Sequence, residues 1–83
     1  MNRDEIFSKV VDILKRYTKN EEALNGVSLD TNILEDLRVN SARLVDVILD
    51  FEDAFDIEIA DDDADSVTTV GDAVRLIETR AGA

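Results

Sequence analysis

Ser41 is the side chain whose setting best suits chemistry. The residues before it are loop-like, and the apolar residues after it recur with helical spacing, at Leu44, Val45, Ile48, Phe51 and Phe55. Ser41 therefore stands at the start of a helix predicted over about residues 41–55, where either Asn40 or Ser41 can act as the N-cap. A serine hydroxyl without a histidine or lysine base beside it is a poor nucleophile for turnover. It can still accept a group from an external enzyme that reaches it.

The composition restricts what else the chain can do. Its 83 residues include 20 acidic and nine basic side chains, a formal net charge of −11, and neither cysteine nor histidine. The usual zinc sites and the common nucleophile and base pairs need those two residue types, so we expect no metal site and no catalytic residue. The charge disfavours binding to nucleic acid through its phosphates and favours basic protein partners. So much like charge also favours a monomer.

The sequence predicts one small domain over residues 1–83, without a targeting or membrane segment. Its first residues are charged and lead directly into an amphipathic pattern, unlike a secretory signal. No run approaches the roughly 18 apolar residues of a spanning helix. We therefore expect a cytoplasmic protein with no membrane span.

Helical periodicity predicts the elements that position Ser41. The first helix is expected over about residues 3–17 with Asn2 as its N-cap, and the last helix from a cap at Thr69 to about Arg80. Residues 18–40 form a long connection to the Ser41 helix, within which residues 21–24 can make a short turn. Five apolar residues can pin this connection onto the helices: Val27, Leu29, Ile33, Leu34 and Leu37. The predicted fold class is all-α.

Acidic side chains dominate the helix that follows Ser41. They are Asp46, Asp50, Glu52, Asp53 and Asp56. The three at 46, 50 and 53 are spaced four and three apart, so they share one helix face. Residues 44–74 contain eleven acids and no lysine or arginine. Most charge runs are solvated faces, but an uncompensated run directly after Ser41 favours a docking face for a basic partner.

A second acidic cluster, Asp61 to Asp65, has carboxylates at alternate positions, as in the first residues of a calcium-binding loop. Ser66 stands at the sixth position, where such a loop has glycine, and Asp72 stands at the twelfth, where it has a bidentate glutamate. An EF-hand is therefore not expected. The cluster suits only weak and non-specific divalent binding.

Two segments around Ser41 resemble an acyl carrier protein in order and spacing. The first is Glu35-Asp36-Leu37, which three residues separate from the serine and its helix, and the second is Phe55-Asp56-Ile57-Glu58-Ile59, at the end of that helix. The resemblance covers about residues 3–80. It implies a four-helix bundle with three long helices, a short third helix at residues 61–66 and a long loop between helices one and two. It also implies that a phosphopantetheinyl transferase moves 4′-phosphopantetheine from coenzyme A to Ser41, where its thiol holds acyl intermediates as thioesters.

The resemblance further implies which residues partner enzymes contact. In this family, partner enzymes bind the helix after the serine through small apolar side chains that acidic side chains surround. The matching apolar positions are Ala42, Val45 and Leu49, and the positions around them are Asp36, Asn40, Asp46, Asp50, Glu52, Asp53 and Asp56. The partners implied are basic-surfaced acyl synthases or acyltransferases of fatty-acid, lipid or related acyl biosynthesis. The bundle interior can shelter the acyl chain, with candidate lining residues Val45, Ile48, Phe51, Val67, Val70 and Ile77.

Four residues near Ser41 depart from the family's usual pattern. Arg38 stands where glycine is common, Asn40 where aspartate precedes the serine, Ala42 where leucine follows it, and Arg43 where an acid is common. All four leave Ser41 in place. They bear on which transferase and which partners fit, and they point to a specialised carrier that serves a dedicated pathway.

An unmodified acidic adaptor that binds a basic protein is the alternative. In an adaptor Ser41 serves only as a helix cap, so Ser41→Ala would lower stability by about 1 kcal/mol and leave binding intact. In a carrier the same substitution removes function.

Overall fold

The computed structural model describes residues 2–81, and its regular elements are helical. They are α1 (Arg3–Leu14), α2 (Glu22–Asn25), the 3₁₀ turn η1 (Ser41–Arg43), α3 (Leu44–Phe55), α4 (Asp61–Asp65) and α5 (Val70–Arg80). The all-α prediction is confirmed, and the short turn expected near residues 21–24 is α2. Within the described residues, extended pairing is limited to one isolated bridge between Asn32 and Thr69.

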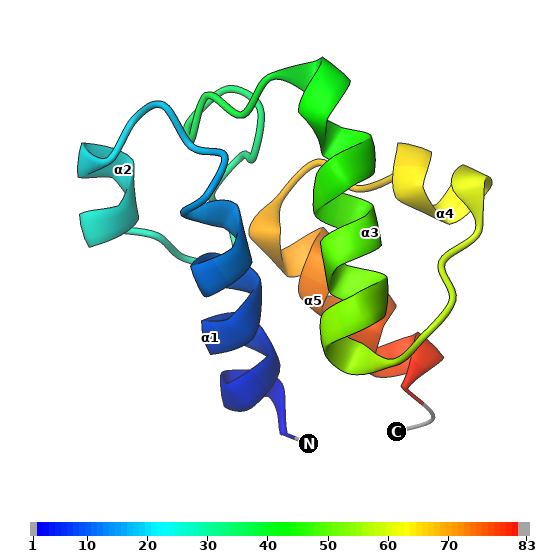
Figure 1. Cartoon of the computed structure of the whole chain (residues 1–83). Coiled ribbons are helices and arrows are strands. Elements are labelled where there is room, and N and C mark those ends of the chain that lie inside the picture. The colour runs from blue at the N-terminus through cyan, green and yellow to red at the C-terminus, as the bar shows by residue number, and fades with distance from the viewer. Residues whose placement is uncertain (1, 82–83) are drawn as a thin grey trace.

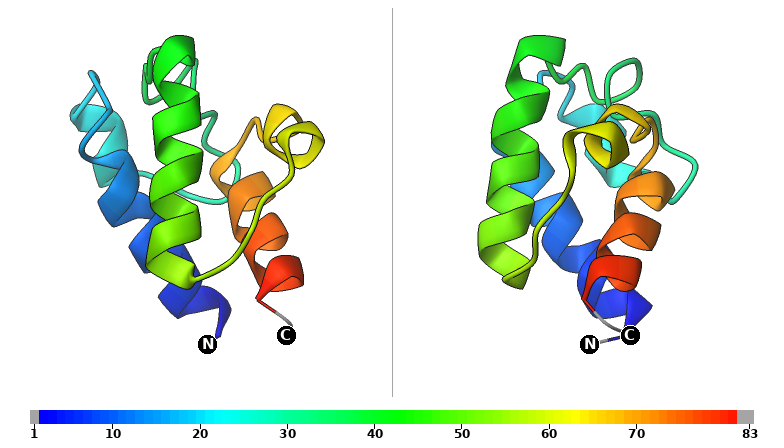
Figure 2. Two further views of the ribbon diagram at one scale, coloured as in Figure 1. Left: turned by 45° about the vertical axis from the view of Figure 1, so that its right-hand side comes forward. Right: turned by 90° about the vertical axis from the view of Figure 1, so that its right-hand side faces the viewer.

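The three long helices form the body of the molecule (Figure 1). α1 packs against both α3 and α5 and runs antiparallel to them, while α4 lies beside α3 on the side away from α1 (Figure 2). α3 begins at the end of the molecule opposite the start of α1 and the finish of α5. The segment that contains Ser41 is therefore presented at one tip of the bundle.

A single apolar core joins these helices to the long loop. The described core contains no buried polar or charged residue, and Phe51 of α3 is its largest fully buried side chain. Ile33, Leu37 and Val39 of the loop are buried with it. Burial of these side chains pins the loop to the bundle, as the apolar pattern predicts for Ile33 and Leu37.

Side-chain caps fix where the first and last helices begin. The Asn2 Oδ1 atom accepts a hydrogen bond from the Glu5 amide at 2.9 Å, as predicted. At α5 the Thr69 hydroxyl and the Asp72 carboxylate form a reciprocal capping box, with bonds of 3.1 and 3.0 Å. α1 ends at Leu14 and not near residue 17, because the amides of residues 16 and 17 bond the carbonyls three residues back and tighten the last turn.

The start of α5 holds the middle of the long loop. The amides of Val70 and Gly71 donate to the carbonyls of Thr31 and Leu29 at 2.9 and 2.8 Å. A Cβ atom at residue 71 would lie 2.8 Å from the Leu29 carbonyl oxygen, closer than side chains approach a backbone oxygen. Gly71, which weakens helix propensity, is thus required for the loop to approach α5.

Candidate functional site

The segment directly before Ser41 is held by its own side chains. The Asp36 carboxylate accepts a hydrogen bond from the Asn32 amide at 2.8 Å, and the Asn32 side chain accepts two more, from the amides of residues 34 and 35. Leu37 and Val39 are buried beneath them. Asp36, predicted as a partner contact, thus stabilises the loop that presents Ser41.

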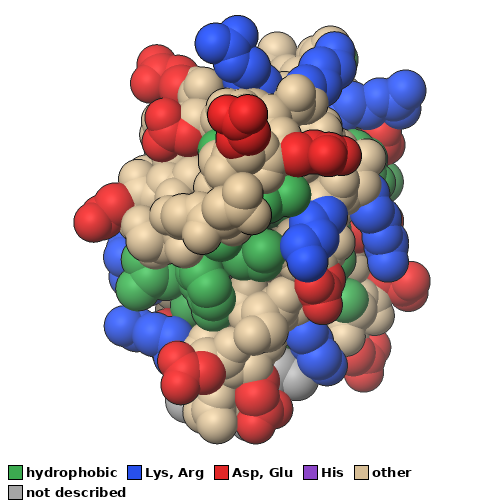
Figure 3. Space-filling view, turned by 90° about the vertical axis from the view of Figure 1, so that its left-hand side faces the viewer, with side chains coloured by type: hydrophobic (Ala, Val, Ile, Leu, Met, Phe, Trp, Pro, Cys, Tyr) green, Lys and Arg blue, Asp and Glu red, His purple; other side chains and the backbone are tan. Residues whose placement is uncertain are grey.

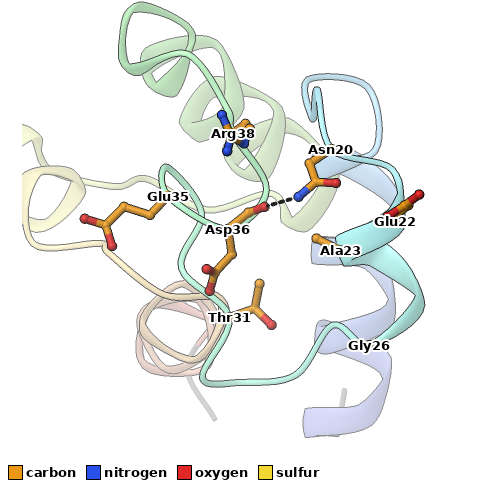
Figure 4. A pocket seen from close by; sticks show the side chains of 8 residues that line it. All are labelled: Asn20, Glu22, Ala23, Gly26, Thr31, Glu35, Asp36 and Arg38. Carbon is orange, nitrogen blue, oxygen red and sulfur yellow. Dashed lines mark hydrogen bonds between the residues drawn. The ribbon is translucent and has the colours of Figure 1, made fainter.

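The end of the α1 region is tied to the same segment. The Lys19 amide donates to the Leu37 carbonyl at 3.1 Å, and the Thr18 hydroxyl donates to that same oxygen. The Asn20 side-chain amide donates to the Asp36 carbonyl at 3.0 Å, across an open, polar hollow of about 480 Å³ (Figure 4). Residues 18–20 therefore contact and hold residues 32–40, the segment before Ser41 that we call the site loop.

Arg38 lines the same hollow and has an uncommon backbone conformation, with φ at 56°. This left-handed conformation suits glycine, which has no Cβ to clash with the following carbonyl. The chain thus has an arginine at a position whose geometry favours the glycine common in the resembling family. Arg38 therefore adopts a backbone conformation that glycine would adopt without steric cost.

Ser41 is exposed and is the first residue of η1, which continues directly into α3. Asn40, and not Ser41, is the N-cap: its Oδ1 atom accepts from the Ala42 amide at 2.9 Å, and its carbonyl accepts from the Arg43 amide at 2.8 Å. Among the side-chain hydrogen bonds of residues 2–81, none uses the Ser41 hydroxyl. The hydroxyl is therefore accessible and has no part in capping the helix.

A mainly apolar groove of about 200 Å³ opens beside Ser41, between α3 and α4. Its lining residues are Ser41, Leu44, Val45, Ile48, Leu49, Glu52, Ile59, Asp61, Ala64 and Asp65. Of the residues expected to shelter an acyl chain, only Val45 and Ile48 line this groove. The other four, Phe51, Val67, Val70 and Ile77, lie in the main core of the bundle and not in this groove, so their part in sheltering an acyl chain stays a prediction.

Two predicted apolar contacts, Val45 and Leu49, are 66% and 55% exposed on α3. Both also line the rim of the groove. A single exposed apolar side chain is common, but neighbouring exposed apolar side chains that form a patch indicate an interaction surface. Ala42 is exposed one turn before them, so the three predicted apolar positions lie together on the outer face of the helix.

Some acidic side chains in and just after α3 have partners within the domain, and others are exposed to solvent. Asp46 forms an ion pair with Arg43 at 3.1 Å, and Glu52 accepts from the Ile59 amide at 2.9 Å. Asp50 accepts from the Tyr17 hydroxyl at 2.5 Å and lies 3.7 Å from Arg16. Donation to that carboxylate raises the pKa of Tyr17, because loss of its proton would place two negative charges together. Asp53 and Asp56 remain exposed.

The acidic residues of α4 do not form a metal centre. Among residues 2–81, no group of three or more potential ligand side chains is arranged to hold a metal ion. Asp63 instead pairs with Arg80 of α5. This ion pair ties the short helix to the end of the last one.

Comparison with known proteins identifies the family. The family model described as "Phosphopantetheine attachment site" matches residues 8–77. An acyl carrier protein from Lactobacillus acidophilus is 38% identical over 82 residues, which cover 99% of this chain and all of the relative. The chain belongs to the acyl carrier protein family. The acyl carrier protein from Thermotoga maritima is 37% identical over 81 residues, 98% of either chain.

A solved structure of the acyl carrier protein from Enterococcus faecalis extends the likeness to three dimensions. Its TM-score with this carrier is 0.79 at 35% identity, over 96% of this chain and 99% of the other. The protein is thus a carrier with a covalently attached 4′-phosphopantetheine group and is not an enzyme. Its partners are a phosphopantetheinyl transferase and enzymes that handle acyl groups. No described helix is long and apolar enough to cross a membrane.

Proposed function

We propose that Ser41 is the attachment point of the 4′-phosphopantetheine group. One observation carries this proposal: the hydroxyl is exposed at the first turn of a long helix, and Asn40 takes over the capping that would otherwise occupy it. The start of the continuous helical segment 41–55 also favours a negatively charged group such as a phosphodiester. The residues around Ser41 therefore fit the group.

The attached group supplies a thiol that holds an acyl chain as a thioester. The residues of this chain supply a place for the acyl chain beside the attachment point, because the groove between α3 and α4 includes Ser41 in its rim and is lined by Leu44, Val45, Ile48 and Ile59. Burial of methylene groups there is favourable by about 0.8 kcal/mol each. Short acyl chains, or part of a longer one, fit its volume of about 200 Å³.

The outer face of α3 is proposed to receive the acyl-handling partners. Ala42, Val45 and Leu49 form its apolar centre, and the exposed Asp53 and Asp56 attract basic-surfaced synthases or acyltransferases. Asp36, Asp50 and Glu52 are engaged within the domain, so we expect them to act mainly by shaping this face. A cytoplasmic monomer that serves a dedicated fatty-acid, lipid or related pathway is the form in which we expect this carrier to act.

Intact mass after incubation with coenzyme A, magnesium and a broad-specificity phosphopantetheinyl transferase tests the attachment point. The wild type and the Ser8→Ala control, which changes an exposed serine of α1, should each gain one phosphopantetheine. Ser41→Ala should gain none. Loading of Ser41→Ala would place the attachment elsewhere. If no transferase loads the wild type, an unmodified acidic adaptor becomes the better interpretation.

A further inference from the structure

A hollow lined by three cations lies on the side of the Ser41 turn that faces α1. It measures about 570 Å³, and its lining residues are Arg16, Tyr17, Thr18, Lys19, Asn40 and Arg43. No acid lines it, although acids outnumber bases by 20 to nine in the chain. Figure 3 looks at the side of α1 and α2, and shows Lys and Arg side chains gathered along its upper edge, the end at which α3 begins. We call this feature the cationic hollow.

The cationic hollow is built into the site loop. Lys19 is fixed beside it by the bond from its amide to the Leu37 carbonyl, four residues before Ser41. Arg43 belongs to the same 3₁₀ turn as Ser41, and Asn40 is the cap of that turn. Any surface that closes over the Ser41 hydroxyl from this side must therefore cover some of these cations.

The charges of the cationic hollow are only partly balanced within the domain. Arg43 pairs with Asp46 at 3.1 Å, and Arg16 lies 3.7 Å from Asp50. Lys19 has no carboxylate within 4.0 Å among residues 2–81. A protein surface that covers an ammonium group without offering a counter-charge loses affinity, because the group gives up its hydration.

We propose that the cationic hollow is a docking site for carboxylates of the phosphopantetheinyl transferase of the same organism. This inference rests on the proposed attachment at Ser41. Acyl-handling enzymes react with the thiol at the far end of a flexible arm and are proposed to dock on the outer face of α3, whereas the transferase has to cover the serine hydroxyl itself. The transferase is therefore the partner that we expect to cover Lys19 and Arg43.

The consequence is a docking face with two poles. Carboxylates of the transferase meet Lys19 and Arg43 at one side of Ser41, and its cations meet the exposed Asp53, in the last turn of α3, and Asp56, which follows that helix. Opposite charges at the two ends fix the orientation of the complex and disfavour a transferase whose surface is basic throughout. Arg43, which replaces the acid common in the family, thereby selects the loading enzyme.

Loading kinetics test the proposal with the full chain, coenzyme A, magnesium and that transferase. Lys19→Glu and Arg43→Glu should each lower kcat/KM about tenfold at low salt, mainly by raising KM, and 0.5 M salt should shrink the loss. The neutral variants Lys19→Gln and Arg43→Gln should have kcat/KM values between those of the wild type and the glutamate variants. Lys9→Glu, which makes the same charge change on α1 and outside the cationic hollow, is the matched control and should load as the wild type does.

Two outcomes would overturn the proposal. One is loading of both glutamate variants at the wild-type rate or faster, which would show that the transferase offers no carboxylates there. The other is a loss that 0.5 M salt leaves unchanged in variants that melt at the wild-type temperature. Failure of the wild type to load at all would refute the attachment at Ser41 instead, so the two proposals fail in different ways.

Discussion

Replacing Arg38 with glycine should stabilise this carrier. At φ 56° a side chain costs about 1 to 2 kcal/mol relative to the right-handed conformation, and glycine avoids that cost. Glycine also loses more backbone freedom on folding, which offsets about 0.5 to 1 kcal/mol of the gain. The expected net effect is about 0.5 to 1 kcal/mol. For a domain of this size, this corresponds to a rise in Tm of about 4 °C.

Arg38→Ala is the matched control for this substitution. It removes the same charge and the same long side chain but keeps a Cβ atom, so the strained backbone is not relieved and Tm should not rise. Thermal unfolding followed by circular dichroism, with chemical denaturation for the free energy, compares both variants with the wild type. An equal rise in the two variants would mean that charge or side-chain contacts explain the effect. No rise with glycine would refute the argument from φ.

Two further predictions concern the start of α5. Gly71→Ala should lower the free energy of unfolding, measured by chemical denaturation, by about 1 to 3 kcal/mol, because the new Cβ would lie 2.8 Å from the Leu29 carbonyl oxygen. Gly26→Ala is the control: its new Cβ would have open space around it, so the free energy of unfolding should not change. The backbone amides of Thr69 and Thr68 donate to the Asp72 carboxylate and lower the pKa of Asp72 in the folded protein. The ionised carboxylate therefore stabilises the fold above the unfolded-state pKa of about 4, and this stabilisation is lost as the pH falls through the lower pKa of the folded state. Asp72→Asn should flatten the acid limb of a Tm against pH curve, and Asp62→Asn, at an exposed position of α4, should not.

The helices could be predicted from sequence because their signals are local. Apolar spacing and the caps at Asn2 and Thr69 lie within a few residues of the helices they start, and the structure confirms both caps. The position of Ser41 at the start of a helical segment could be predicted for the same reason. Sequence alone left Asn40 and Ser41 as equal cap candidates, since either side chain can reach the next amides. Only the folded backbone assigns the cap to Asn40.

The parts that sequence did not reveal depend on contacts between distant segments. Tyr17 and Asp50 are 33 positions apart, so nothing in the α3 pattern indicated that Asp50 is engaged. The cationic hollow lies between the end of the α1 region and the Ser41 turn, and the hydrogen bonds that hold Thr18 and Lys19 to the Leu37 carbonyl are not visible as a motif. The groove beside Ser41 needs α4, whose sequence is mostly aspartate and has no apolar period.

The way the site loop is stabilised leaves Ser41, the proposed attachment point, without a structural role that a modification would disturb. Asp36, Leu37 and Val39 anchor the loop, and Asn40 caps the helix. Because none of these roles falls on Ser41, its modification should leave the domain's own contacts in place. Ser41→Ala should therefore change the free energy of unfolding by less than about 0.5 kcal/mol, and Asn40→Ala should lower it by about 1 kcal/mol. Chemical denaturation of both variants would reveal the opposite ranking if Ser41 were the cap.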